Sequence, residues 1–209
     1  MKKSNVALLT IDIQYIHSHP DFSVSGKDLP PESREYTRER LFGTVLPSIR
    51  RLQNAFRANN ALVVHIVLNH QAPDGSDLDP DIYARDSISG NPDRNSWSIR
   101  RRQDPMTAIL MEVAPLPGEI VLEKVTHSSF ASTNLNNVMI NHKVDTIIHT
   151  GGATNCCVQA TANDSKRLGY KTVCVPDACI AKWPKSQEEG LAMVDYDALL
   201  SVEDAIALL

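Results

Sequence analysis

The stretch "TIIHTGGATNCCVQATANDSKRLGY", residues 146–170, decides the fold. It opens on an apolar, β-branched run that predicts a buried strand, and it continues into a segment typical of a helix. The turn between them contains the pair Gly151-Gly152, and two of the chain's four cysteines follow as Cys156-Cys157. Such a turn is suited to cradle a phosphate, close a disulfide, hold a metal or present a nucleophile, and the rest of the chain narrows the choice.

The same alternation of apolar run and helical stretch repeats along the chain, which is the signature of a parallel sheet covered on both faces. The runs are rich in β-branched residues and lack a clean polar–apolar alternation, as doubly buried strands do. Six strands are predicted, with the weakest pattern in the last: Val6–Thr10, Leu62–Leu68, Glu119–Leu122, Thr146–His149, Thr172–Val175 and Ala198–Val202. The predicted helices are Tyr36–Ala58, Asn134–His142, Cys156–Leu168 and Gln187–Tyr196. Right-handed crossovers then give one three-layer α/β/α domain over residues 1–209.

Two long irregular segments, 15–35 and 69–105, each follow the carboxyl end of a predicted strand. Both are rich in Pro, Asp, Ser and Gly and carry little periodicity. In open α/β sheets ligands bind at that edge, so the two segments are predicted to wall or cover a pocket.

The composition is typical of a soluble globular protein, with 42% hydrophobic and 22% charged residues and a formal net charge of −4. That charge favours neither nucleic acid nor an anionic membrane as a partner. The run Arg100-Arg101-Arg102 is interpreted as a solvated loop, with contact to an anionic substrate or another subunit as the alternative. No apolar stretch has the length of a membrane span or the form of a signal peptide, so a cytoplasmic location with reduced thiols is expected.

The cysteines match no zinc-ligand spacing. Cys174 is interpreted as a small core residue and Cys179 as part of a loop.

Nucleotide binding, the usual role of this architecture, is not supported by the glycine pattern. The place of a dinucleotide fingerprint after the first strand is held by "TIDIQYIHS", which contains no glycine. No G-x-x-x-x-G-K-[ST] loop occurs either. The pair Gly151-Gly152 alone is too short a motif to indicate a nucleotide site.

Three reactive side chains fall at the ends of predicted strands. Asp12 closes the first strand, Lys124 the third, and Cys156-Cys157 follow the fourth. Taken singly, each has a common structural explanation: a helix cap or salt bridge for the acid, solvation for the lysine, packing for the cysteines. Because the carboxyl ends of parallel strands meet at one edge of the sheet, we expect the acid, the base and a thiol to share a site.

The position of the cysteines suits a thiolate. Thr154 or Asn155 is predicted to cap the helix, which places both cysteines in its first turn. There the free N–H groups and the helix dipole stabilise a thiolate, a nearby ammonium adds to this, and a carboxylate can accept the thiol proton. The same N–H groups can bind the oxyanion of a tetrahedral intermediate. Position alone does not choose between Cys156 and Cys157.

In three blocks the sequence resembles the isochorismatase-like cysteine hydrolases, which include nicotinamidases, N-carbamoylsarcosine amidases and ureidoacrylate-type amidohydrolases. The blocks are "ALLTIDIQ" at 7–14, "GEIVLEKVTHSSFASTNL" at 118–135 and "GGATNCCVQATANDSKRLGY" at 151–170. The family pattern G-x-x-T-[DN]-x-C-V aligns the nucleophile with Cys157 and leaves Cys156 at a variable position. The family's Asp and Lys align with Asp12 and Lys124.

The resemblance implies hydrolysis of a small amide, ureido or carbamoyl C–N bond through a thioester on Cys157. It also implies a homo-oligomer, a dimer or tetramer, and a six-stranded parallel sheet of order 3-2-1-4-5-6. In that order Lys124 must reach back about 10 Å from the third strand to the first. The family's cis peptide bond falls between Ala153 and Thr154, where it aims N–H groups at the reacting carbonyl. No cofactor is implied by the residues.

Substrate contacts are predicted beside the three reactive residues, at Gln14, Tyr15, Trp97 and Phe130. Family members often read D-x-Q-N-D-F after the first strand, whereas this chain has Tyr15 and His17, so a named substrate does not transfer from the family. Zinc-holding nicotinamidases carry D-x-H after the second strand, but here Leu68 stands two residues before His70. No metal is therefore expected.

Two other functions stay open at this point. An isochorismatase reaction would use Asp12 to protonate a vinyl ether and would not need a thiol, although the complete motif around Cys157 argues against it. A noncatalytic thiol switch would use Cys156 and Cys157 as a redox pair. Adjacent cysteines form only a strained ring, and a switch would leave Asp12 and Lys124 unexplained.

Overall fold

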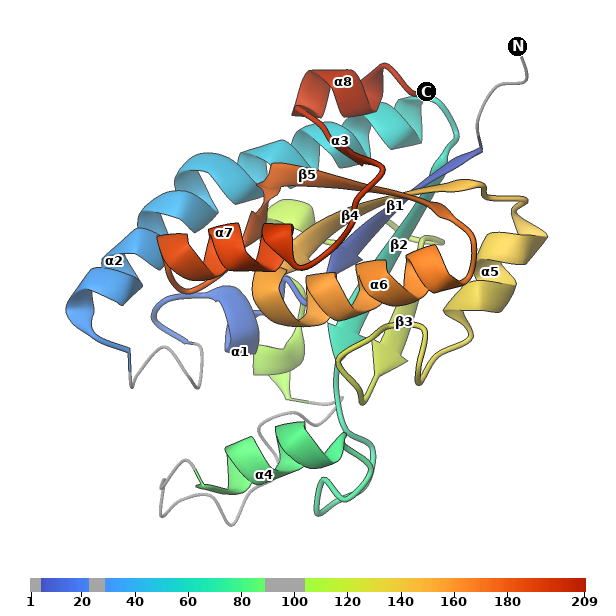
Figure 1. Ribbon diagram of the computed structural model, residues 1–209. Coiled ribbons are helices and arrows are strands. Elements are labelled where there is room, and N and C mark those ends of the chain that lie inside the picture. Colours follow the sequence, from blue (N-terminus) through green and yellow to red (C-terminus); the bar gives the residue numbers. More distant parts are fainter. Residues whose placement is uncertain (1–4, 23–28, 89–103) are drawn as a thin grey trace.

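Six parallel strands form one sheet in the order β3-β2-β1-β4-β5-β6 (Figure 1). The computed structural model describes residues 5–22, 29–88 and 104–209. The strands are β1 (Val6–Ile11), β2 (Leu62–Leu68), β3 (Ile120–Lys124), β4 (Thr146–Gly152), β5 (Lys171–Ile180) and β6 (Ala198–Leu199). The α/β class and the strand order are confirmed. Trp97 and the run Arg100-Arg101-Arg102 lie outside the described residues, so their assigned roles stay predictions.

Helices cover both faces of the sheet and complete the three layers (Figure 1). The α-helices are α1 (Tyr15–Ser18), α2 (Pro31–Arg40), α3 (Leu46–Ala58), α4 (Pro80–Ile88), α5 (Leu135–Asn141), α6 (Gln159–Arg167), α7 (Pro184–Ala192) and α8 (Val202–Ile206). One buried apolar cluster gathers around Leu52 and Phe56 of α3, and a second, on the other face, around Leu135 and Met139 of α5. Among the described residues, no helix combines the length and apolar character that crossing a membrane requires.

The first long helical region begins earlier than predicted. It starts at Pro31 rather than Tyr36 and runs through α2, a π-helical segment at Leu41–Val45, and α3. Proline suits the first helical position, because its fixed φ matches a helix and its missing N–H would have no intrahelical partner there. The apolar periodicity marked only the part of this region that packs on the sheet.

The two C-terminal strands also differ from their predicted bounds. β5 continues past Pro176 to Ile180, so Cys179 lies in a strand that pairs with β4 rather than in a loop. β6 is only two residues long, because the side chain of Ser201 caps α8 by accepting a hydrogen bond from the N–H of Asp204 at 3.1 Å. The cap commits the following residues to a helix.

Gly151 allows β4 to lie close to β1 just before the turn that contains Cys156 and Cys157. Its φ is +112°, a region that residues with a side chain rarely adopt. A Cβ atom at this position would lie 2.1 Å from the carbonyl oxygen of Ile11, its partner on β1. The glycine is therefore required both by its backbone conformation and by the contact between the two strands.

We predict that Gly151→Ala lowers the free energy of unfolding by about 3 kcal/mol or more, because the added methyl overlaps rigid backbone and φ is unfavourable. Gly43→Ala is the matched control, since a Cβ atom at Gly43 would have open space within 4 Å. It should leave stability unchanged or raise it by about 0.5–1 kcal/mol. Urea unfolding measures both, and equal effects of the two variants would contradict the proposed role of Gly151.

Two histidines are buried inside the sheet. His65 on β2 places Nε2 3.0 Å from Oε2 of Glu119, whose other oxygen accepts a hydrogen bond from Nε of Arg57 at 2.7 Å. His149 on β4 donates from Nδ1 to the carbonyl oxygen of Val173 at 3.0 Å. Burial lowers the pKa of both imidazoles, in spite of these hydrogen bonds, and that of His149 falls to about 4. Both histidines are therefore neutral in the folded protein at pH 7.

Acidification should destabilise the protein through His149. Below pH 6.5 this residue takes up a proton in the unfolded chain. In the folded chain it stays neutral until the pH falls to about 4. Stability attributable to His149 is thus present at pH 7 and falls by up to about 3 kcal/mol on the way to pH 4. His149→Asn preserves a donor for Val173 and removes the titration. We expect the variant to show a shallower loss of unfolding free energy between pH 7 and pH 4, and an unchanged slope would contradict this.

Candidate active site

Asp12 leaves the end of β1 in a left-handed conformation that turns its side chain into the site. Its φ is +51°, and its N–H donates to the carbonyl oxygen of Ile66 on β2 at 3.0 Å. Its own carbonyl oxygen accepts a hydrogen bond from the hydroxyl of Ser18 on α1 at 3.1 Å. Asp residues tolerate this conformation better than most residues with a side chain. The carboxyl group is buried, with the residue only 3% exposed.

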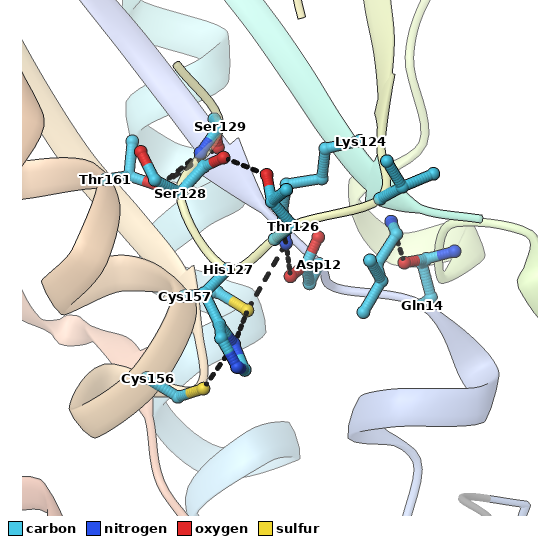
Figure 2. A network of polar contacts seen from close by, with 12 residues as sticks. Asp12, Gln14, Lys124, Thr126, His127, Ser128, Ser129, Cys156, Cys157 and Thr161 are labelled. Carbon is cyan, nitrogen blue, oxygen red and sulfur yellow. Dashed lines mark hydrogen bonds and ion pairs between the residues drawn. The ribbon is translucent and has the colours of Figure 1, made fainter. Parts of the chain in front are cut away.

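Lys124 connects Asp12 to Cys157. It is the last residue of β3 and is fully buried, with Nζ 2.8 Å from Oδ2 of Asp12 and 3.3 Å from Sγ of Cys157. Nζ also donates to the carbonyl oxygen of Thr126 at 2.9 Å. Figure 2 shows the side chain extending to the ends of β1 and β4. The three residues predicted to carry the chemistry thus lie together, and the lysine spans the width of β2.

Cys157 lies in a short π-helical turn, Thr154–Val158, between β4 and α6. Ala153 occupies the cap position, and the hydroxyl of Thr154 donates instead to Oε1 of Gln187 on α7 at 2.6 Å. The predicted cap at Thr154 or Asn155 is therefore wrong by one or two residues. α7 packs closely here, because a Cβ atom on Gly190 would lie 2.6 Å from the backbone of Asn155. The turn is held by α7 as well as by its own helix.

The non-proline cis peptide bond is present, but it joins Gly152 to Ala153. The predicted position, between Ala153 and Thr154, is wrong by one residue. Gly152 is the last residue of β4 and Thr154 is the first of the helical turn, so Ala153 alone forms the connection. The cis bond is the one that enters Ala153 from the strand, whereas the bond that leaves it already belongs to the helical turn.

The electrostatics of the site favour a proton on Asp12 and a negative charge on Cys157. Burial raises the pKa of Asp12 well above its usual range, with the ammonium of Lys124 opposing and the Cys157 sulfur adding to the shift. A hydrogen bond from Cys156 lowers the pKa of the Cys157 thiol well below its usual range, where burial opposes and Lys124 reinforces the effect. Although burial disfavours an ammonium here, the negative charge that Asp12 or Cys157 carries raises the pKa of Lys124.

His127 and Cys156 also belong to the site, although no strand-end pattern in the sequence predicts His127 there. Nδ1 of His127 lies 3.1 Å from Sγ of Cys156 and 4.0 Å from Sγ of Cys157. Both residues are half-buried. The one sequence feature that pointed to His127 is its position in "EKVTHSSF", three residues after Lys124 on the connection that follows β3. The rule that the carboxyl ends of parallel strands share one edge of the sheet does not predict that this connection folds back over the cysteines.

A set of hydroxyl groups holds that connection in place. The hydroxyl of Thr126 donates to the carbonyl oxygen of Ser128 at 2.8 Å and lies 2.7 Å from the hydroxyl of Ser132. Ser129 anchors the connection to α6, since its N–H and its hydroxyl both lie 3.0 Å from Oγ1 of Thr161 (Figure 2). These bonds lie on either side of His127 and thereby fix where its ring can lie.

Three of the predicted substrate contacts, Gln14, Tyr15 and Phe130, lie among the described residues. Gln14 is fully buried, and its amide nitrogen donates to Oδ1 of Asn69 at 3.1 Å and to the carbonyl oxygen of Thr107 at 2.6 Å. Both amide hydrogens are thus engaged within the protein, where Gln14 braces the ends of β1 and β2. Tyr15 packs partly buried against the core, and Phe130 stacks on Tyr170 with ring centroids 6.1 Å apart. The contact of Gln14, Tyr15 and Phe130 with a substrate stays a prediction.

The isochorismatase domain model matches residues 6–204. The chain belongs to the isochorismatase family. Among solved structures, this family member is similar to an isochorismatase family protein from Desulfovibrio vulgaris subsp. vulgaris str. Hildenborough, with 27% identity, a TM-score of 0.74 and coverage of 98% of this chain and 99% of the other. N-carbamoylsarcosine amidase from Thermoplasma acidophilum has a TM-score of 0.67 and 24% identity, covers 94% and 95% of the two chains, and supports the fold alone.

Curated relatives of this isochorismatase-family chain include amidohydrolases. It is 28% identical over 151 residues to maleamate amidohydrolase of Pseudomonas putida, in an alignment that covers 69% of this chain and 65% of the relative. It is 28% identical over 137 residues to N-carbamoylsarcosine amidase of Arthrobacter sp., covering 62% and 47%. The chain thus spans between about half and two thirds of the length of these relatives.

The thiolate of Cys157 should be visible in its alkylation kinetics. A thiol of pKa 9.0 loses reactivity toward iodoacetamide about 100-fold between pH 8 and pH 6, because only the thiolate reacts. We expect the rate at Cys157 to change much less than this over the same interval, in buffer containing a chelator. Lys124→Met removes the facing ammonium and should restore a steep pH dependence. Tandem mass spectrometry separates Cys157 from Cys156, and a steep profile in the unaltered protein would contradict the thiolate.

Proposed function

We propose that the protein hydrolyses a C–N bond of a small amide, ureido or carbamoyl substrate through a thioester on Cys157. The observation that carries this proposal is the buried ammonium of Lys124, 2.8 Å from the carboxyl group of Asp12 and 3.3 Å from the sulfur of Cys157. An acid, a cation and a thiol in mutual contact are the groups that acyl transfer from a nitrogen leaving group requires. The amidohydrolases among the curated relatives support the choice of bond.

In the first step the Cys157 thiolate attacks the substrate carbonyl carbon. A C–S bond forms, and the π electrons of the carbonyl move onto its oxygen. The N–H groups of Thr154 and Cys157, at the start of the helical turn, are the proposed donors to this oxyanion. Preorganised donors of this kind are typically worth about 100- to 1000-fold in rate.

In the second step the tetrahedral intermediate collapses and the C–N bond breaks. The departing nitrogen takes the proton that the raised pKa of Asp12 keeps on its carboxyl group. Asp12 is then a carboxylate beside Lys124, in a position to accept a proton from water. That water attacks the thioester, the C–S bond breaks, and the acid product leaves with the thiolate restored.

Lys124 compensates the one negative charge of the site in both halves of this cycle. In the resting state the negative charge lies on Cys157, and in the acyl-enzyme it lies on Asp12. Nζ is within contact of both atoms without moving, at 3.3 and 2.8 Å. The buried site therefore never holds an uncompensated charge, whose cost in a low dielectric would be several kcal/mol.

A second candidate rests on the raised pKa of Asp12. A carboxyl group that stays protonated is also the acid that vinyl ether hydrolysis needs, and that reaction makes no use of a thiol. Retained isochorismate hydrolysis in a Cys157→Ala variant, together with its loss in Asp12→Asn, would favour this candidate.

A small-molecule substrate follows from either reaction. The single domain, the homo-oligomer and the cytoplasmic location stay predictions of the sequence.

The test of the amidohydrolase proposal is ammonia or amine release from a panel of small amides, ureas and carbamoyl compounds. We expect Cys157→Ala to lower turnover by at least about 1000-fold, because it removes the group that forms the covalent bond. Cys174→Ala is the matched control, a second buried cysteine that lies on β5 outside the site. It should retain turnover. Equal activity of the Cys157→Ala variant and the unaltered protein would refute the mechanism.

A further inference from the structure

The sulfur of Cys157 has two sides with different chemistry. Lys124 and Asp12 approach it from one side, whereas His127 and Cys156 lie on the opposite side (Figure 2). The mechanism above uses only the first side. On the second side, Nδ1 of His127 and the sulfurs of Cys156 and Cys157 all lie within 4.8 Å of one another.

We propose that His127, Cys156 and Cys157 bind a thiophilic divalent cation such as Zn²⁺ or Cd²⁺ through these three atoms. One imidazole nitrogen and two thiolates form a donor set that soft and borderline metals prefer over Mg²⁺ or Ca²⁺. Among the described residues this is the one group of three or more such side chains whose donor atoms converge closely enough to share an ion.

The spacing of the three atoms is close to that of a tetrahedral site. With Zn–S bonds of about 2.3 Å and a Zn–N bond of about 2.0–2.1 Å, neighbouring ligand atoms lie about 3.6–3.8 Å apart. Nδ1 of His127 is 3.1 Å from Sγ of Cys156 and 4.0 Å from Sγ of Cys157, which brackets that value. The two sulfurs lie within 4.8 Å of each other, so side-chain rotations that move these atoms by up to about 1 Å bring all three to the spacing of a tetrahedral site. The fourth position is open to water, as in three-ligand zinc sites.

Access and charge also suit a cation. Cys156 and His127 are half-buried and Cys157 is 7% exposed, so the group can be reached from solvent. Two thiolates neutralise the charge of a divalent ion, and the proton displaced from Cys156 leaves to solvent. The Cys157 thiolate then no longer balances the ammonium of Lys124, so Asp12, 2.8 Å from Nζ, releases its own proton and takes over that role. With two protons released for each divalent cation bound, the net charge of the site does not change.

The consequence is inhibition, and this part rests on the proposed function. A sulfur that donates its electron pair to a metal is not available to attack a carbonyl carbon. The cation and the substrate would therefore compete for Cys157, which makes the protein reversibly sensitive to thiophilic metals. The binding itself does not depend on any activity, so the two are tested separately.

The experiment is a titration of the substrate-free protein with Cd²⁺, followed through the ultraviolet charge-transfer absorption of Cd²⁺–thiolate bonds. We expect a saturable band with one Cd²⁺ bound per chain. His127→Gln and Cys156→Ser retain hydrogen-bonding groups but remove the soft ligands. Each should weaken binding by more than about tenfold, since even outer-sphere partners of metal ligands are typically worth 10- to 100-fold. Cys174→Ala, with its cysteine outside the group, should bind as the unaltered protein does.

A band that does not saturate, or that survives both variants unchanged, would overturn the metal site. It would leave His127 and Cys156 as hydrogen-bonding partners of the Cys157 thiolate. Circular dichroism checks that each variant is folded. In the unaltered protein, bound Cd²⁺ should also slow alkylation of both Cys156 and Cys157, and undiminished alkylation at saturation would likewise refute the site.

The activity measurement separates this inference from the proposed function. Full amide turnover at a Cd²⁺ concentration that saturates the band would overturn the inhibitory role. Restoration of turnover by a chelator would support it. Saturable binding without turnover of any amide would leave the metal site standing and count against the proposed function alone.

Discussion

The contact of one buried ammonium with both a carboxyl group and a sulfur is the constraint on which the rest of the site depends. Lys124 lies 2.8 Å from Asp12 and 3.3 Å from Cys157 in a place without solvent exposure. An uncompensated charge there would be costly, so the lysine couples the two partners. When one of them is ionised the other is held neutral, which is the exchange that a thiol acyl transfer needs.

The fold satisfies this constraint by bringing three strand ends to one edge. β2 lies between β1 and β3, so the lysine must span it, and a long flexible side chain is suited to that distance. Asp12 reaches the lysine because it leaves β1 in a left-handed conformation, at φ +51°. Gly151 allows β4 to approach β1 closely enough for the turn with Cys157 to lie opposite. The geometry of the site is thus produced by backbone features at Asp12 and Gly151.

The connection after β3 brings further side chains to the site. Serine and threonine hydroxyls hold it against α6, and it brings His127 over Cys156. One face of the Cys157 sulfur consequently meets hard, charged groups, while the other meets a nitrogen and a sulfur that favour soft metals. The same atom is the proposed nucleophile and the proposed ligand of a thiophilic cation.

The sequence by itself determined the α/β class and most of the strands, because buried strands and amphipathic helices have periods that a chain displays locally. It also singled out Asp12, Lys124 and Cys157, through strand ends and a motif written in adjacent residues. Only the tertiary structure decided the position of the cis bond at Gly152–Ala153, the internal commitment of the Gln14 amide, and the approach of His127 to the cysteines. Each of these depends on contacts between segments far apart in the chain, and such contacts leave no periodic trace in the sequence.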